Sequence, residues 1–218
     1  MFENVTVIGA GRVGSAVAAR LRERGVSVGE DGELRLLCVP DAAIAEVARG
    51  IEPGPWVAHV SGATPLAALD PHERRFSVHP LQTFVRWRGA EQLDGAWAAV
   101  TGETDEGRER GLWLARTLGL EPFELADEGR PLYHAGAAIA SNYLVTLYRT
   151  AAGLFDQVGA PPEALVPLMQ RTIDNGFELT GPIARGDWST VDAHLAALHD
   201  RAPELESIYR VLAEATAP

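Results

Sequence analysis

The segment that most constrains the fold of this 218-residue chain is Gly9-Ala10-Gly11-Arg12-Val13-Gly14. A short apolar run, Val5-Thr6-Val7-Ile8, precedes it, and apolar residues recur at helical spacing after it. In such a strand, turn and helix unit, the glycines permit a tight turn, a close approach of pyrophosphate and close packing of the helix on the strand. The N–H groups at the start of the helix also favour phosphate. We therefore predict that a dinucleotide is bound by Gly9, Gly11, Arg12, Val13 and Gly14. The alternative is that the glycines form a purely structural turn.

The residues after this unit determine how the adenosine end of a dinucleotide is held. An acidic residue about 20 positions beyond the glycines commonly binds the ribose, and Glu30 is the candidate. Its carboxylate would repel an adenosine phosphate and so favours NAD, whereas Arg12 shifts the balance toward NADP, and both cofactors remain open.

The linker around Gly29-Glu30-Asp31-Gly32 joins strands predicted at 26–28 and 33–39. It is too short for a crossover helix, because parallel strands need a dozen or more residues to reconnect. We therefore expect an antiparallel hairpin closed by the Asp31-Gly32 turn. Such a hairpin leaves out the crossover helix that usually supports the adenosine of the dinucleotide.

Further along the chain, alternating strands and helices indicate an α/β sheet. Strands are expected at 56–60, 76–78, 97–100 and 121–125, and helices at 42–48 and 103–118. From residue 132 on the pattern is helical, with helices expected at 132–158, 162–176, 189–198 and 202–213. We predict a Rossmann-like, mainly parallel sheet domain over residues 1–129 and an all-α domain over residues 130–218.

Composition narrows the class of protein. The net charge of −11 and the absence of a dense arginine patch argue against nucleic-acid binding. No apolar run reaches the roughly 20 residues of a membrane helix, so we expect a cytoplasmic protein that acts on a small molecule.

All 19 basic residues are arginine, which excludes lysine chemistry because arginine stays protonated. Cys38 lies in an apolar run and is expected to be a buried small hydrophobe. Apart from the weak pair His194 and His199, the six histidines are scattered, and we predict no metal site.

Two polar motifs follow predicted strands, namely His59-Val60-Ser61-Gly62 and His79-Pro80-Leu81-Gln82-Thr83-Phe84. Ligands of open α/β sheets bind at the carboxyl ends of the strands. We therefore expect one cleft to be lined by His59, Ser61, His79 and Gln82. Alternatively, these side chains end the strands and satisfy buried backbone groups.

The helical region holds a second group of candidates. His134 and Asn142 fall near one face of the predicted long helix, which is otherwise rich in alanine and glycine. They either face a substrate or bond across a helix interface. Arg185 lies in a turn and either binds a substrate carboxylate or pairs with Asp187, which is expected to cap the next helix.

Together these motifs resemble a known family. The glycine turn, Val39-Pro40-Asp41, the two histidine motifs, Tyr133-His134 with Ser141-Asn142, and the segment 180–187 are similar to the Rossmann-like predicted oxidoreductases that carry a C-terminal helical domain of unknown function. That family looks related to 6-phosphogluconate dehydrogenase, ketopantoate reductase and pyrroline-5-carboxylate reductase. The resemblance implies an NAD(P) cofactor that also contacts Pro40, a substrate in the interdomain cleft, and a homodimer formed through the helical domain.

The chain departs from these relatives at a catalytic position. Where the hydroxyacid dehydrogenases carry a lysine one turn before an asparagine, Asn142 follows Ala138-Ile139-Ala140-Ser141. We expect a reductase of a small 2-oxo acid or imine, similar to ketopantoate reductase, with a protonated His79, preferred over His134, as the general acid. Asn142 and Ser61 are expected to polarise the carbonyl and Arg185 to bind the carboxylate. The alternative is a catalytically degenerate Rossmann protein that binds a nucleotide or metabolite as a regulator or assembly partner.

Overall fold

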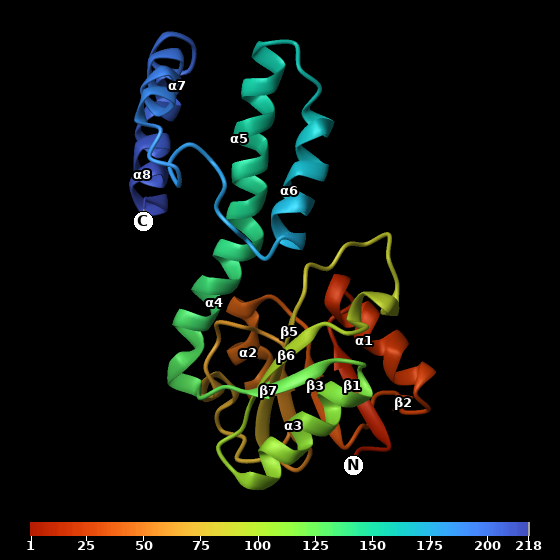
Figure 1. The fold of residues 1–218 in the computed structure, drawn as a ribbon. Helices are drawn as coiled ribbons and strands as arrows, with labels where there is room; N and C mark the ends of the chain where they lie inside the picture. Colours follow the sequence, from red (N-terminus) through yellow and green to blue (C-terminus); the bar gives the residue numbers. More distant parts are fainter. Residues whose placement is uncertain (218) are drawn as a thin grey trace. The chain divides into compact units, whose positions relative to one another are not determined.

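The computed structural model describes residues 1–217 and contains a seven-stranded sheet of order β2-β1-β3-β4-β5-β6-β7 (Figure 1). Neighbouring strands are parallel, except that β5 and β6 are antiparallel. The mainly parallel α/β sheet predicted from the sequence is confirmed. Its strands are β1 (Asn4–Ile8), β2 (Ser27–Val28), β3 (Leu34–Leu37), β4 (Trp56–His59), β5 (Arg75–Leu81), β6 (Trp97–Thr101) and β7 (Glu121–Glu124).

Helices connect the strands and then continue alone toward the carboxyl terminus. The α-helices are α1 (Arg12–Glu23), α2 (Ile44–Arg49), α3 (Asp105–Thr117), α4 (Arg130–Ala138), α5 (Leu144–Gln157), α6 (Leu165–Asp174), α7 (Trp188–Arg201) and α8 (Glu206–Thr216). A π-helical turn, Ile139–Tyr143, separates α4 from α5. Short 3-10 helices include η1 (Asp41–Ala43), η2 (Leu66–Leu69) and η3 (Ala90–Leu93).

The chain forms two compact units, Met1–Ser141 and the residues from Asn142 on. The sequence prediction divides the chain at residue 130 instead. Helix α4 accounts for the difference, because its first residue, Arg130, is buried within the first unit. The assignment of functional domains remains a prediction.

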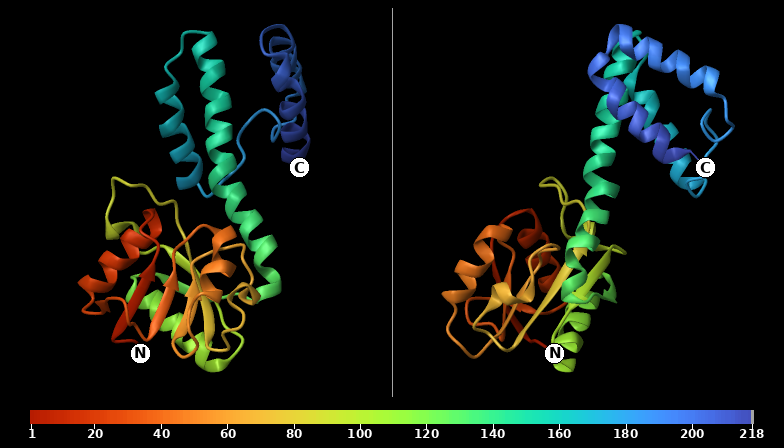
Figure 2. Two further views of the ribbon diagram at one scale, coloured as in Figure 1. Left: turned by 180° about the vertical axis from the view of Figure 1, so that it is seen from behind. Right: turned by 90° about the vertical axis from the view of Figure 1, so that its left-hand side faces the viewer.

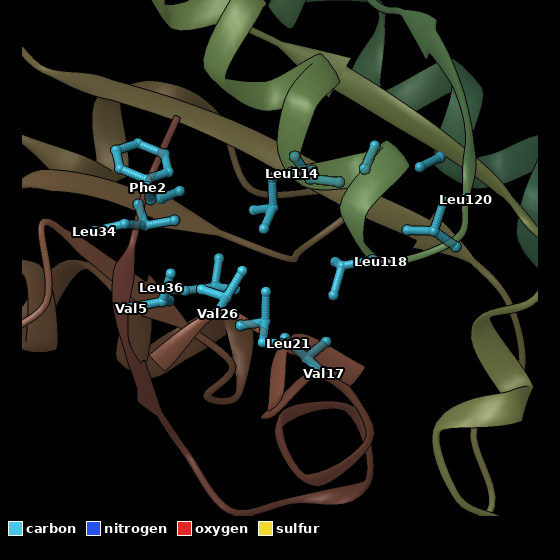
Figure 3. Close-up of a cluster of buried hydrophobic side chains, with 14 of the residues drawn as sticks. Phe2, Val5, Val17, Leu21, Val26, Leu34, Leu36, Leu114, Leu118 and Leu120 are labelled. Carbon is cyan, nitrogen blue, oxygen red and sulfur yellow. The ribbon is translucent and has the colours of Figure 1, made fainter. Parts of the chain in front are cut away.

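The core of the first unit lies on both faces of the sheet. On one face α1 and α3 pack Val17, Leu21 and Leu114 against Val5 and other strand residues (Figure 3). On the other face α2 and η2 cover a smaller apolar cluster, and Figure 2 shows α2 and α3 on opposite sides of the sheet. Because both faces are covered, β4 is buried along its whole length, as is usual for parallel sheets. The carboxyl edge of the sheet is left for a site.

The hairpin expected between β2 and β3 is wrong. Both strands run parallel to β1 on opposite sides of it, with Val28 and Leu34 each opposite Val5. Parallel strands usually need a dozen or more connecting residues, because the chain must return along the whole length of the first strand before the second begins. Here β2 ends opposite the same residue of β1 at which β3 begins, so the short linker only has to cross β1. Gly32 permits this crossing, since a Cβ there would overlap the backbone of Val5 and Thr6.

In the second unit, α5 packs against α6 and α7 against α8. Asp187 caps α7 as predicted, because its carboxylate accepts a hydrogen bond from the Thr190 backbone N–H at 3.2 Å. Few apolar side chains are buried in this unit, among them Leu165, Val191 and Leu198. Over residues 1–217, the structure has no helix with the length and apolar character needed to cross a membrane.

Candidate functional site

The glycine turn joins β1 to α1 at the carboxyl edge of the sheet. Gly9 has a φ of 112°, and a side chain there would collide with the Cys38 carbonyl. A side chain at Gly14 would collide with the Gly9 carbonyl oxygen. Gly11 differs from both, because its backbone is extended and a Cβ there would meet no atom within 4 Å. The fold therefore requires Gly9 and Gly14, whereas Gly11 borders open space.

The amino end of α1 is prepared for an anion. Within the described chain, Gly11 at the N-cap provides no side-chain hydrogen bond and the first turn carries no acidic residue. The positive end of the helix dipole and the first N–H groups, which include those of Arg12 and Val13, are therefore uncompensated by the helix itself. A phosphate group would supply the missing acceptor.

Glu30 lies where the linker crosses β1. Its side chain is exposed, and its backbone carbonyl accepts a hydrogen bond from Thr6 Oγ1 at 2.8 Å. Because β2 pairs only with Asn4 and Val5 at the start of β1, Glu30 does not follow a full-length strand as the ribose-binding residue normally does. Its role in ribose binding remains a prediction.

His79 belongs to a cluster formed by β5 and α4. Its Nδ1 lies 2.7 Å from the hydroxyl oxygen of Tyr133, and the two rings meet edge to face at 5.6 Å. The ring of His134 is 6.0 Å from that of His79. Gly62 lies between the two histidines, since a Cβ there would come within 2.7 Å of His79 and 2.8 Å of His134. The strand-end motifs and the start of α4 thus converge.

The surroundings of His79 keep it neutral near pH 7. Burial, together with the charges of His134 and Arg130, lowers the pKa of His79 to about 4, and Asp41 opposes the shift. Burial raises the pKa of Tyr133 to about 12, so the phenol retains its proton. A phenol both donates and accepts, and Tyr133 therefore supports either neutral tautomer of His79. The resting form differs from the protonated His79 expected from the sequence.

His59 and Ser61 are buried beneath this cluster. His59 Nδ1 accepts a hydrogen bond from the Ser61 backbone N–H at 3.2 Å, and burial lowers the pKa of His59 to about 3. The Ser61 hydroxyl contacts Thr64 Oγ1 at 2.9 Å and accepts from the Thr64 backbone N–H at 3.0 Å. In this arrangement both side chains shape the loop after β4.

Arg130 is a site residue that sequence reasoning did not single out. It is 1% exposed, and its guanidinium donates to the Ser61 carbonyl at 3.1 Å, to Ser77 Oγ, and to Asp127 at 2.6 Å. Asp127 also accepts from the Leu66 backbone N–H. The pair fixes α4, and with it Tyr133 and His134, to the strand ends. An arginine at the start of a helix looks like a surface residue in sequence, so no local signal reveals this role.

Gln82 is placed in the loop after β5. Its amide nitrogen donates to the Gln92 carbonyl at 3.0 Å, and its amide oxygen accepts from the Thr83 backbone N–H at 2.8 Å. Both ends of the side chain are therefore used by the loop itself. Pro40, in turn, lies in the segment between β3 and η1 and directly precedes η1. It follows Val39, whose side chain borders Gly9.

Asn142 and Arg185 belong to the second unit. Asn142 lies in the π-helical turn, which changes the angular spacing on which the expected strip with His134 depends. Arg185 donates to the Thr180 carbonyl within its own turn, and no ion pair between it and Asp187 occurs in the described part of the chain. Their roles toward a substrate remain predictions.

Among residues 1–217, no group of three or more His, Cys, Asp or Glu side chains is arranged to hold a metal ion. His194 and His199 are each engaged by other side chains, Tyr209 at 2.7 Å and Glu206 at 3.2 Å.

The fold and the glycine turn define a Rossmann-type α/β protein with a helical second unit. The chain belongs to the family described as "Domain of unknown function (DUF2520)", whose model matches residues 96–216. The family resemblance inferred from the sequence motifs is confirmed. A search of the curated proteins finds no match.

Solved structures share this fold over nearly the whole chain. One is the "putative NADP oxidoreductase" of Bacteroides fragilis, with 22% identity, a TM-score of 0.80, and coverage of 98% of this chain and 97% of that one. A Thermotoga maritima protein has 23% identity, a TM-score of 0.73, and coverage of 97% and 98%. The 1-pyrroline-5-carboxylate reductase of Streptococcus pyogenes has 14% identity, a TM-score of 0.62, and coverage of 98% and 96%.

Proposed function

We propose that this protein is an NAD(P)-dependent oxidoreductase that acts on a small 2-hydroxy or 2-oxo acid, or on the corresponding imine. The observation that carries the proposal is the His79–Tyr133 pair, which lies in the same unit as a glycine turn open to phosphate at Gly11. The names of the similar structures support it, since they include an NADP oxidoreductase and a pyrroline-5-carboxylate reductase.

The backbone from Gly9 to Gly14 would hold the diphosphate of the cofactor, with Arg12 beside it and Pro40 at the neighbouring strand end. When bound, the nicotinamide accepts or supplies hydride. The protein's own contribution is to orient the substrate and to move one proton. Asn142 and Arg185 are proposed to contact the carbonyl and the carboxylate of the substrate, as the family resemblance suggests.

His79 is proposed to transfer that proton. In the oxidative direction, neutral His79 accepts the hydroxyl proton through Nε2 as hydride leaves the adjacent carbon, while Nδ1–H donates to Tyr133. In the reductive direction the same proton returns to the carbonyl oxygen. Because the pKa of His79 is lowered to about 4, the oxidative reaction needs no deprotonation step above about pH 5, whereas reduction is favoured by acid or by a bound anion.

The first experiment is titration of purified protein with NADH and NADPH. No binding of either at millimolar concentration would defeat the oxidoreductase proposal. If one binds, its oxidation is measured against a panel of 2-oxo acids, starting with ketopantoate, and cyclic imines. His79→Gln should then lower kcat by about 10²-fold or more, with cofactor affinity retained. His134→Gln is the matched control, and a loss in His134→Gln with none in His79→Gln would reassign the proton-transfer residue.

Two observations favour a second candidate function. The linker that crosses β1 replaces the full-length strand and helix that normally support the adenosine, and the lysine of the hydroxyacid dehydrogenases is missing. A protein that binds a nucleotide or metabolite as a regulator would fit both features. Nucleotide binding without turnover of any substrate in the panel would support this candidate.

A further inference from the structure

A hollow of about 170 Å³ lies beside the glycine turn on the flank of α1. One wall is formed by the turn and the first helical residues, including Gly11, Arg12 and Ser15. The other wall is the loop Val85–Gly89, which follows β5 and carries Arg86 and Arg88. The hollow therefore lies between the glycine turn and two arginines that are more than seventy residues further along the chain.

The loop Val85–Gly89 is held in place by a buried side chain. Gln92, which is 5% exposed, accepts a hydrogen bond from the Val85 backbone N–H at 2.8 Å. Its amide nitrogen donates to the carbonyl oxygens of Arg88 and Gly89, each at 3.0 Å. These bonds fix the backbone on both sides of Arg86, so the loop is ordered in advance of any ligand.

A second buried side chain holds this region against α1. Arg20 donates to the Ala90 carbonyl at 2.9 Å and pairs with Asp94 at 2.6 Å. The residues of η3 are thereby fixed to the last turn of α1. Because η3 directly follows the loop, these contacts position the loop wall beside the helix wall, as a preorganised binding site requires.

The walls of the hollow are positively charged. They contain three arginines and no acidic residue, although the chain carries 30 acidic residues. Within residues 1–217, none of these arginines forms an ion pair with a carboxylate. The nearby Glu91 carboxylate accepts instead from the Gly89 backbone N–H at 3.0 Å. Arg88 lies over the Trp87 ring at 5.1 Å. Guanidinium groups that converge on one space without carboxylates match the oxygens of phosphate groups.

We infer that Arg86 and Arg88 act with Arg12 to bind the phosphate groups of a dinucleotide, which would lie between the start of α1 and the loop Val85–Gly89. The inference rests on the proposed function and extends it, because neither the glycine motif nor the family resemblance assigns this loop. The shared chemistry is a phosphate ester. It can come from the diphosphate common to NADH and NADPH or from the additional phosphate of NADPH.

The test is to measure by calorimetry the affinities of ADP, NADH and NADPH for the wild type and for Arg86→Gln, Arg88→Gln and the double variant. Each single substitution should weaken binding about tenfold, and raising the salt concentration should weaken the wild type more than the double variant. Equal losses for all three ligands would assign the arginines to the diphosphate, and a loss greatest for NADPH would assign them to its extra phosphate. Arg22→Gln is the matched control, because Arg22 is an exposed arginine in the last turn of the same helix.

Two negative outcomes are distinguishable. Wild-type binding that the double variant retains within twofold would overturn this inference and leave the proposed function intact. Failure of the wild type to bind any of the three ligands would overturn both. All three arginine side chains are exposed, so these substitutions should leave the fold unchanged, and circular dichroism of each variant verifies this.

Discussion

His59 ends β4 and His79 lies near the end of the neighbouring strand β5, but the two histidines differ in the chemistry that they can perform. His59 is completely buried, and its Nδ1 is used by the backbone of Ser61. His79 is only partly buried, and its partner is a side chain, Tyr133, that can both donate and accept. A histidine that exchanges protons needs such a partner, whereas His59 is suited to remain neutral as part of the core.

The pH dependence of stability should expose this role of His59. Its pKa falls from 6.5 in the unfolded chain to about 3 in the folded protein. The contribution of neutral His59 to the free energy of unfolding is therefore fully present above pH 6.5. It is lost as the pH falls toward 3, because the histidine of the unfolded chain takes up a proton at higher pH than the buried one. When the pH is lowered from 7 to 5, this effect of His59 should decrease the free energy of unfolding by about 2 kcal/mol.

Urea titrations at the two pH values measure this effect. The loss between pH 7 and pH 5 should be about 2 kcal/mol smaller in His59→Gln than in the wild type, whatever the absolute stability of the variant. His194→Gln, at an exposed position, should keep the wild-type dependence. An undiminished pH dependence in His59→Gln would show that other groups cause it.

At the level of the elements, the sequence predicts the strands and helices closely, because apolar periodicity and glycine turns act locally. The prediction fails between β2 and β3, where the outcome depends on the register of both strands on β1. For the candidate site, the sequence motifs name His79 and His134, whose roles remain predictions, and assign no role to Tyr133, Arg130 and Gln92. Their partners lie on other elements, and no spacing along the chain indicates such contacts.

The glycine turn permits a test that separates folding from binding. A side chain at Gly11 meets no atom of the protein, so Gly11→Ala should cost less than about 1 kcal/mol of stability, chiefly through the N-cap. It should nevertheless weaken NADH and NADPH binding at least tenfold, since a methyl group would take the space of the diphosphate. Gly14→Ala, which collides with the Gly9 carbonyl, should lower the thermal unfolding temperature strongly. Full nucleotide binding by Gly11→Ala would place the phosphate elsewhere.

Helix α4 depends on one ion pair, in which Arg130 is buried and Asp127 is partly exposed. Arg130→Met would leave Asp127 without its partner and Ser61 with an unpaired carbonyl, and should cost about 3 kcal/mol of unfolding free energy. Arg210→Met, which breaks a comparable but exposed pair with Glu206, should cost less than about 1 kcal/mol. Urea titration of both variants checks the contrast. Equal costs would mean that burial of Arg130 does not determine its contribution.

At the scale of the whole molecule, the second unit leaves much apolar surface uncovered. Val166 and Leu168 on α6 are 55% and 61% exposed, and Val211 on α8 is 60% exposed. A unit of this size that buries so few apolar side chains has a small core of its own. Exposed apolar side chains that gather on a surface commonly mark an interface, and the family resemblance suggests that the occupant is a second copy of the chain.

We therefore predict a homodimer formed through the helical unit, to be measured by analytical ultracentrifugation. Val166→Asp and Ile173→Asp, at exposed apolar positions on one face of α6, should each weaken the dimer by about 2 kcal/mol, because a charge would enter an apolar interface, and together they should yield a monomer at micromolar concentration. Arg171→Asp, at an exposed polar position on the same helix, is the control for the change in charge and should leave the dimer intact. The first unit has its own core, so the double variant should retain nucleotide binding. A wild type that sediments as a monomer at all concentrations would refute the dimer and leave the nucleotide site to be judged by itself.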